Sequence, residues 1–204
     1  MTFPTSTPRP ASDPIALGDR AVEDLRFIRR SMDPGPAFTA VPGWGGVAMG
    51  LTAVGAAWVA AQQPTTSRWV TVWILDAALA FVIGALAIRH KARSAGLPVF
   101  SGVGRRFVLS FLPASLAGAV LTVALWSRDS IALLPGVWML LYGASVVSAG
   151  TYSVSVVPLT GACFMLLGAV ALLSPAGFEE VWMAVGFGGL HVLFGTIVAR
   201  RHGG

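Results

Sequence analysis

The sequence predicts an all-α integral membrane protein, a bundle of six transmembrane helices preceded by a cytoplasmic amphipathic helix. Of its 204 residues, 55% are hydrophobic and 11% are charged, and the mean hydropathy is +0.74. A soluble domain carries about 25% charged residues, so this composition cannot supply a water-facing surface. Six apolar runs lie between residues 41 and 199, and positive charge is concentrated in every second gap between them.

The region before the apolar runs has two parts. Residues 1–12 are rich in proline, serine and threonine, which predicts a disordered tail. Apolar residues then recur at helical spacing over residues 13–33, with acidic residues first and arginines last, as the helix dipole favours. We expect an amphipathic helix there. It either lies on the inner leaflet, with Arg29 and Arg30 near lipid phosphates, or docks a cytoplasmic protein partner.

Each apolar run has about the 20 residues that a helix needs to cross a hydrocarbon core about 30 Å thick. The runs must be helical because backbone groups in lipid have no other hydrogen-bond partners. Together they predict one transmembrane domain over residues 41–199, followed by a cytoplasmic tail at 200–204. The expected spans are residues 41–61, 69–88, 107–126, 131–150, 155–173 and 181–199.

The charges in the gaps predict the orientation. The fifth gap contains Glu179 and Glu180, whereas the cations are concentrated in the N-terminal region, the second gap and the C-terminus. Because basic residues remain in the cytoplasm, both termini are expected inside the cell. The pattern is typical of a small bacterial protein of the inner (plasma) membrane. The basic second gap is expected to contact lipid or a partner through Arg89, Lys91, Arg93, Arg105 and Arg106.

Two short matches suggest an internal repeat. Pro42-Gly43 is followed by Gly50 in the first span, and Pro135-Gly136 is followed by Gly143 at the same interval in the fourth. Two halves of three spans have opposite topologies, as in many transport proteins, so a 3+3 inverted repeat is one interpretation. Chance similarity between membrane helices is the other. Pairs of small residues four apart occur in five spans, which favours close helix packing and a homo-oligomer.

Asp76 and His191 are the ionisable side chains within the spans that could carry chemistry. Groups of this kind are costly in lipid, so they are candidates for a functional role. Both lie about 10–13 Å from the expected outer interface, at 1.5 Å per residue. If the second and sixth helices meet, the pair could hold or relay a proton. Alternatively, each makes only structural hydrogen bonds inside the bundle.

Other polar side chains and prolines lie near the middle or ends of the spans. The hydroxyl groups either line a path for a solute or bridge neighbouring helices. The prolines are expected to kink or unwind their helices, with Pro113 placed furthest inside. The hydroxyl-bearing residues are Thr52, Ser115, Tyr142, Thr160 and Thr196, and the prolines are Pro113, Pro135 and Pro158.

Several functional classes are not favoured. The single cysteine, Cys163, excludes an intrachain disulfide and a cysteine-based metal site. One in-span histidine cannot provide two axial haem ligands, and the Gly43–Ala48 glycine motif lacks the preceding strand of a dinucleotide site. The net charge of +5 is explained by topology and anionic lipid, and not by nucleic acid. We therefore expect no cofactor, no metal and no nucleic-acid partner.

The sequence favours a small transporter or channel for an ion or small solute, with Asp76 and His191 as its polar centre. A non-catalytic membrane sensor or scaffold, docking a partner through residues 13–33, is the alternative. A membrane-embedded lipid enzyme is the third hypothesis, although no reactive pair of side chains supports it.

Overall fold

The computed structural model describes residues 22–27, 39–94, 96 and 102–202. The tail 1–12, most of the expected helix over 13–33 with Arg29 and Arg30, and the last two residues lie outside the described residues. Residues 22–27 are helical and belong to a first unit, Met1–Pro36. The second unit, Ala37–Gly204, contains all six apolar runs.

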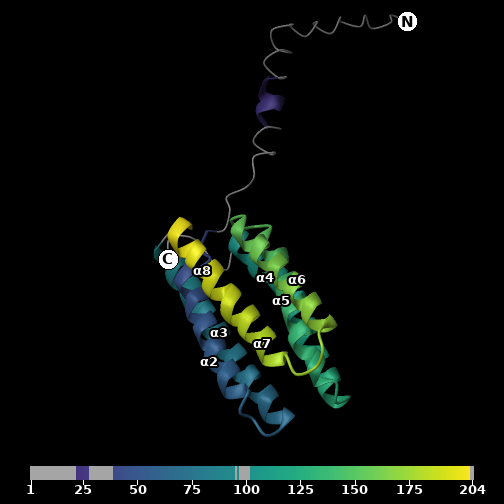
Figure 1. Ribbon diagram of the computed structural model, residues 1–204. Helices are drawn as coiled ribbons and strands as arrows, with labels where there is room; N and C mark the ends of the chain where they lie inside the picture. The colour runs from purple at the N-terminus through teal and green to yellow at the C-terminus, as the bar shows by residue number, and fades with distance from the viewer. Residues whose placement is uncertain (1–21, 28–38, 95, 97–101, 203–204) are drawn as a thin grey trace, which may run out of the picture. The chain divides into compact units, whose positions relative to one another are not determined.

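Within the described residues the second unit is all-helical, as predicted (Figure 1). Six helical segments are long and apolar enough to cross a membrane by length and composition, which indicates a bilayer environment. The sixth contains a π-helical stretch between two α-helices. The elements are α2 (Gly43–Ala60), α3 (Thr66–Ser94), α4 (Gly102–Ser127), η1 (Ile131–Leu133), α5 (Leu134–Gly150), α6 (Val156–Leu173), α7 (Glu179–Met183), η2 (Ala184–Leu190) and α8 (His191–His202).

Three helices extend beyond the expected spans. α3 has 29 residues and α4 has 26, whereas about 20 cross a hydrocarbon core. α8 likewise includes Arg200 and Arg201, which were expected in a tail. Charged side chains end an apolar run but do not end a helix, because backbone hydrogen bonding continues where the side chain reaches water. The end of the bundle with the basic residues is called the arginine end: Arg89, Lys91, Arg93, Arg105, Arg106 and Arg200. The opposite end is called the tryptophan end: Trp58, Trp69, Trp126 and Trp182.

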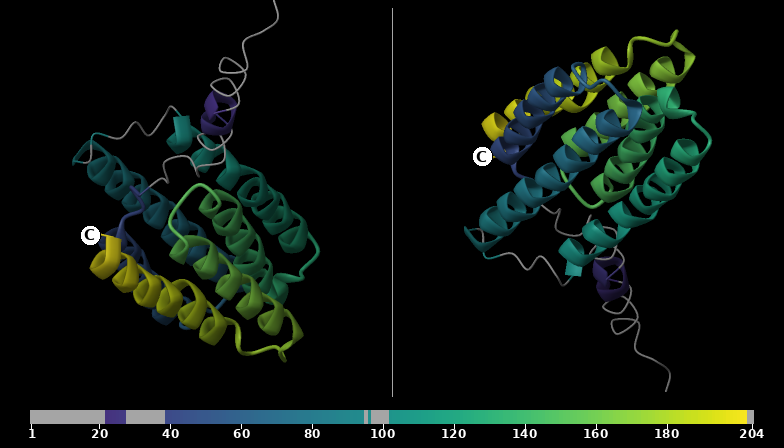
Figure 2. Two further views of the ribbon diagram at one scale, coloured as in Figure 1. Left: turned by 90° about the horizontal axis from the view of Figure 1, so that it is seen from above. Right: turned by 90° about the horizontal axis from the view of Figure 1, so that it is seen from below.

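Most helix packing occurs within two sets of three helices. In the first set, α2 packs against α3 and α8, and in the second, α5 packs against α4 and α6. Both views of Figure 2 show α4, α5 and α6 gathered on one side of α2, α3 and α8. The segment α7–η2 contacts α2 on one side and α6 on the other. It therefore connects the two sets.

Glycines allow the closest helix contacts within each set. A Cβ on Gly43 of α2 would clash with the backbone of Ala199 in α8. A Cβ on Gly143 of α5 would lie 2.6 Å from the carbonyl oxygen of Gly161 in α6. Both contacts are with backbone atoms, which cannot rotate away as a side chain can. Close approach of this kind replaces the hydrophobic effect as a source of helix association in lipid.

The three prolines occupy different positions in their helices. Pro135 and Pro158 lie in the first turns of α5 and α6, where the missing N–H would have no intrahelical partner. They begin helices and leave the hydrogen-bond ladders intact. Pro113 lies inside α4, where it removes a hydrogen bond to the carbonyl four residues before it.

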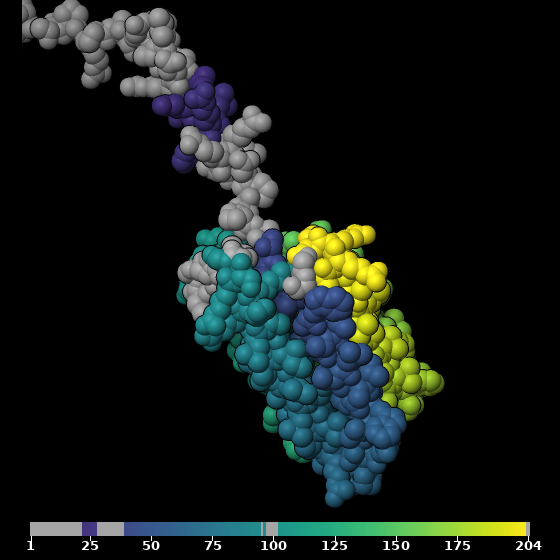
Figure 3. All heavy atoms as spheres, turned by 90° about the vertical axis from the view of Figure 1, so that its left-hand side faces the viewer, coloured from purple at the N-terminus to yellow at the C-terminus, as the bar shows by residue number. Residues whose placement is uncertain are grey.

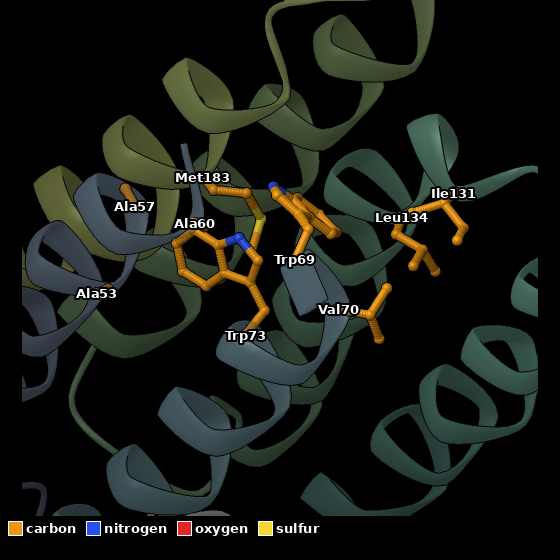
Figure 4. Close-up of a cluster of buried hydrophobic side chains, with 9 residues drawn as sticks. All are labelled: Ala53, Ala57, Ala60, Trp69, Val70, Trp73, Ile131, Leu134 and Met183. Carbon is orange, nitrogen blue, oxygen red and sulfur yellow. The ribbon is translucent and has the colours of Figure 1, made fainter. Parts of the chain in front are cut away.

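A buried apolar cluster at the tryptophan end connects the two sets (Figure 4). Trp69, Val70 and Trp73 of α3 lie with Met183 of α7 and with Leu134 at the start of α5. Each tryptophan buries a large apolar area of about 150–250 Å², so the cluster makes a major contribution to packing there. The cluster holds the two sets together at this end.

At the arginine end, Lys91 connects three parts of the first set. Its Nζ donates one hydrogen bond of 3.0 Å to the carbonyl of Val41, just before α2, and one of 3.0 Å to the carbonyl of His202, at the end of α8. A cation near the C-terminal carbonyls of α8 also complements the negative end of its dipole. Lys91 therefore has a structural role in addition to any contact with lipid.

We expect Lys91→Met to lower the free energy of unfolding in detergent by about 1–2 kcal/mol, because two charge-assisted hydrogen bonds are lost and one of them is partly exposed. The measurement is chemical unfolding followed by circular dichroism. Arg89→Gln removes one positive charge from the same end of α3 and serves as the control. An equal loss in both variants would show that net charge matters, and not the two carbonyl contacts.

Candidate functional site

The first polar site lies where the two sets of helices meet. Tyr142 of α5 and His191, the first residue of α8, are joined by a hydrogen bond of 2.7 Å between Oη and Nε2. The other ring nitrogen of His191, Nδ1, lies 2.8 Å from the carbonyl oxygen of Phe187. Both ring nitrogens are thus occupied within the bundle, and the pair is only partly buried.

The backbone around His191 explains its position. Residues Ala184–Leu190 form a π-helix, in which the usual hydrogen-bond register is shifted. Its sequence includes Gly186, Gly188 and Gly189, which have low helix propensity and fit an irregular segment. π-helical turns occur frequently at functional sites. The local sequence thus places the only in-span histidine of the described residues directly after a deformable segment.

The hydrogen bonds define the form of the histidine. A carbonyl oxygen can only accept, so Nδ1 donates to Phe187. In a neutral imidazole the Nε2 atom is then the acceptor, and the Tyr142 hydroxyl donates to it. The arrangement is complete for a neutral ring. A ring with hydrogens on both nitrogens would need the Tyr142 oxygen to accept instead.

Aromatic rings surround this hydrogen bond. The ring of Tyr142 lies 4.9 Å from Phe164, 5.4 Å from Phe187 and 5.9 Å from Phe111, measured between centroids. His191 lies 5.1 Å from the Phe164 ring. These distances are within the range for favourable aromatic pairs. The rings come from α4, α5, α6 and η2, so a change in the spacing of the two sets would disturb the whole cluster.

The second polar site lies between α2 and α3. Asp76 is on the side of α3 that also carries Trp69 and Trp73, and its carboxyl group lies near the side chain of Thr52 in α2. The Thr52 hydroxyl also lies 2.8 Å from the carbonyl oxygen of Met49. Asp76 is partly buried, whereas its neighbour Leu75 is 65% exposed and faces outward. The carboxyl group is therefore on the packed side of the helix.

Asp76 and His191 do not pair with each other. His191 uses both nitrogens on Tyr142 and Phe187, and Asp76 contacts Thr52. Similar depth along the membrane normal does not bring them together, because they belong to different interfaces. The candidate residues thus form two sites, Asp76 with Thr52 and His191 with Tyr142.

The remaining hydroxyl candidates make structural hydrogen bonds. Ser115 of α4 lies 2.9 Å from Ser145 of α5, so this contact bridges two helices of the second set. Thr160 and Thr196 donate to carbonyl oxygens four residues earlier in their own helices, at 2.8 and 2.7 Å. Of the basic candidates, Arg89, Arg93, Arg105 and Arg106 are exposed at the arginine end.

Sequence reasoning missed a polar network at the tryptophan end. Trp69 stacks on Trp138 with centroids 5.9 Å apart and planes 6° apart, and its Nε1 donates to Glu180 Oε1 at 2.7 Å. Trp138 Nε1 donates to Thr122 Oγ1 at 2.7 Å. The Trp73 Nε1 is buried and has no hydrogen-bond partner among the described residues. Tryptophans near a span end predict only an interface position, so no signal in the sequence identified these partners.

No family model, no curated protein and no solved structure matches this chain. In the part of the chain that the structure describes, no group of three His, Cys, Asp or Glu side chains is placed to hold a metal ion. Function is therefore argued from the two polar sites and from the arrangement of the helices that carry them.

Proposed function

We propose that this chain is a small transporter for a proton or another small cation, with Asp76 as the residue that carries it. The observation that supports the proposal most directly is the position of the Asp76 carboxyl, packed between α2 and α3 against the Thr52 hydroxyl. A carboxyl group within a span costs about 2.5–3.5 kcal/mol even on the gentler scales. A purely structural bridge between two helices could be made by an uncharged amide at lower cost.

The hydrogen bonds of Thr52 couple this site to protonation. The hydroxyl has one hydrogen, and two acceptors, the Met49 carbonyl and the Asp76 carboxyl, are near it. A protonated Asp76 can donate to Thr52 while Thr52 donates to Met49. An ionised Asp76 can only accept, so Thr52 must turn its hydrogen away from Met49. Gain or loss of a proton at Asp76 thereby changes a contact inside α2.

The division into two sets of helices supports transport by a rocking movement. Transporters commonly move one group of helices against another around a central site. Here the sets meet at the Tyr142–His191 hydrogen bond and at the Trp69–Trp138 stack. The π-helix η2 lies beside this junction and provides a segment that can deform. Separation at one end, with contact retained at the other, would open this junction to one side of the membrane. Asp76 is on the same side of α3 as Trp69, which is part of the junction.

Helix packing also supports the inverted repeat. If the first three spans correspond to the last three, α2 corresponds to α5, α3 to α6, and α4 to the sixth span. α2 packs against α3 and α8, just as α5 packs against α6 and α4. Each set would then contain two helices of one repeat and the third helix of the other. The matched glycines differ in their neighbours, since Gly43 faces α8 whereas Gly136 faces α6.

The proposed orientation places the arginine end in the cytoplasm and the tryptophan end outside, in the inner membrane of the cell. The positive-inside rule supports it. A homo-oligomer and a cytoplasmic partner for residues 13–33 remain predictions of the sequence.

Asp76→Asn tests the proposal. In proteoliposomes we expect proton or sodium flux to fall to the level of empty vesicles. The amount of folded protein should stay the same, because asparagine keeps the size of the side chain and can still hydrogen-bond Thr52. Flux is measured with a trapped pH-sensitive dye and, separately, with a sodium tracer.

Asp129→Asn is the matched control, since it removes a carboxylate from the loop between α4 and η1, where asparagine also tolerates the positive φ of 55°. Flux that survives in Asp76→Asn, or a parent protein that moves neither cation, would refute the proposed role. Loss of flux that follows loss of folded protein would assign Asp76 a structural role instead.

A further inference from the structure

An open groove runs along α8 beside α2, away from both polar sites. It has a volume of about 610 Å³ and is lined by Val54 of α2 and by residues from Gly188 to Arg200. Figure 3 shows α2 and α8 side by side. Val54 and Leu193 on its borders are 49% and 54% exposed. In a bilayer this face is in contact with lipid.

One end of the groove is lined by two consecutive glycines of η2, Gly188 and Gly189. Gly188 is buried against Val54, whereas a Cβ on Gly189 would lie 3.9 Å from the Ala184 carbonyl oxygen, an ordinary van der Waals distance. The walls are apolar and include Val192, Leu193 and Ile197. From Gly188 to Arg200 the groove extends over 12 residues, or about 18 Å at 1.5 Å per residue. One leaflet of the hydrocarbon core is about 15 Å thick, so the groove matches the depth of a single leaflet.

The two ends of the groove differ in charge. Arg200 lines the arginine end and is exposed, and its neighbour Arg201 is exposed but does not line the groove. The opposite end, at Gly188 and Gly189, has no charged residue among those that line it. An apolar channel one leaflet deep with a guanidinium at the interface has the chemistry of a phospholipid site, since arginine pairs well with phosphate oxygens.

We propose that this groove binds one acidic phospholipid, with an acyl chain along Gly189, Leu193 and Ile197 and the headgroup phosphate at Arg200. A second copy of this chain is a poorer fit, because a helix about 10 Å wide needs a broad complementary surface, whereas the residues that line this groove come almost entirely from one helical segment. A soluble anion would use Arg200 but not the apolar walls. The site includes neither Asp76 nor His191, but it shares Gly188 and Gly189 with η2, so lipid binding is measured separately from flux.

The test uses the full-length protein in detergent micelles, titrated with dioleoyl phosphatidylglycerol, and native mass spectrometry to count bound lipid. Dioleoyl phosphatidylcholine and glycerol phosphate are the comparison ligands. We expect one tightly bound phosphatidylglycerol per chain. Arg200→Gln should weaken it about fivefold, the effect of one interfacial cation, whereas the adjacent Arg201→Gln should change the affinity less than twofold.

Gly189→Leu should remove the bound lipid by filling the groove without displacing the backbone. Gly55→Leu is its matched control, because a Cβ there meets nothing within 4 Å and Gly55 does not line the groove. Leu193→Trp, which fills the groove from its wall, provides a second test if Gly189→Leu folds poorly. Thermal unfolding of each variant shows that it is folded.

Four results would overturn the proposal. Equal weakening by Arg200→Gln and Arg201→Gln would indicate a general surface charge effect. Lipid that remains bound to folded Gly189→Leu and Leu193→Trp would place it elsewhere. If glycerol phosphate, which has no acyl chains, displaced the bound phosphatidylglycerol, the site would be one for a soluble anion. Dissociation of a dimer by Gly189→Leu, with no effect on lipid, would show that copies of the chain meet at this face.

Discussion

Gly143→Ala is expected to lower the free energy of unfolding by about 1–3 kcal/mol, the usual cost of adding atoms to a tightly packed interface. The new methyl group would lie 2.6 Å from the carbonyl oxygen of Gly161 and 2.8 Å from the backbone nitrogen of Met165. Neither atom can move unless α5 and α6 separate. Because α5 and α6 form the most extensive helix contact of the second set, separation there affects the whole set.

The control for this prediction is Gly55→Ala, which should raise the free energy of unfolding. At Gly55 a Cβ meets nothing within 4 Å, so alanine adds helix propensity without a clash. It should stabilise the protein by up to about 1 kcal/mol. Reversible unfolding in mixed micelles, followed by circular dichroism, measures both variants. A destabilising Gly55→Ala would show that another group packs against Gly55. A neutral Gly143→Ala would show that α5 and α6 are further apart than the structure has them.

Tyr142→Phe is expected to destabilise the protein by about 1–3 kcal/mol, because it leaves the Nε2 acceptor of His191 without its donor in a site of low polarity. His191→Phe should have a comparable effect, since both the Tyr142 hydroxyl and the Phe187 carbonyl lose their partner. Thermal and chemical unfolding of the purified variants give these values.

The double variant distinguishes a structural contact from a functional one. With phenylalanine at both 142 and 191, no ring polar atom remains unpaired, so the double variant should be more stable than the sum of the single effects predicts. If Tyr142 and His191 only connect the two sets of helices, the double variant should still transport. If they also carry the proton, it should be stable and inactive. An additive cycle would contradict the hydrogen bond itself.

The class of the protein could be predicted from the sequence because hydropathy and length are local properties. All six spans are present as helices. The small residues were expected to mark close contacts between helices. Gly46 of α2 is at such a contact, because a Cβ there would lie 3.2 Å from the Cα of Gly195 in α8. The spacing of the small residues could not predict which helix packs against which, because one helix face with glycines fits another about equally well.

The site was predictable only in part, for a related reason. Asp76, His191, Tyr142 and Thr52 were all identified as candidates, because polar groups within spans are conspicuous. Their pairing depends on the rotation of each helix about its axis, which is set by contacts distant in sequence. Depth alone suggested that Asp76 and His191 could meet. Rotation instead places Asp76 against α2 and His191 against α5. The π-helix that positions His191 has no signal in the sequence beyond its glycines.

The stacked indoles of Trp69 and Trp138 have an optical consequence. They belong to different sets of helices, and their planes are 6° from parallel at 5.9 Å between centroids. Two indoles this close couple electronically, so their absorption and emission depend on the stack. A movement that separates the sets would break the stack and change both spectra. The Trp69–Trp138 stack would therefore allow the proposed movement between the two sets of helices to be tested by spectroscopy without any added label.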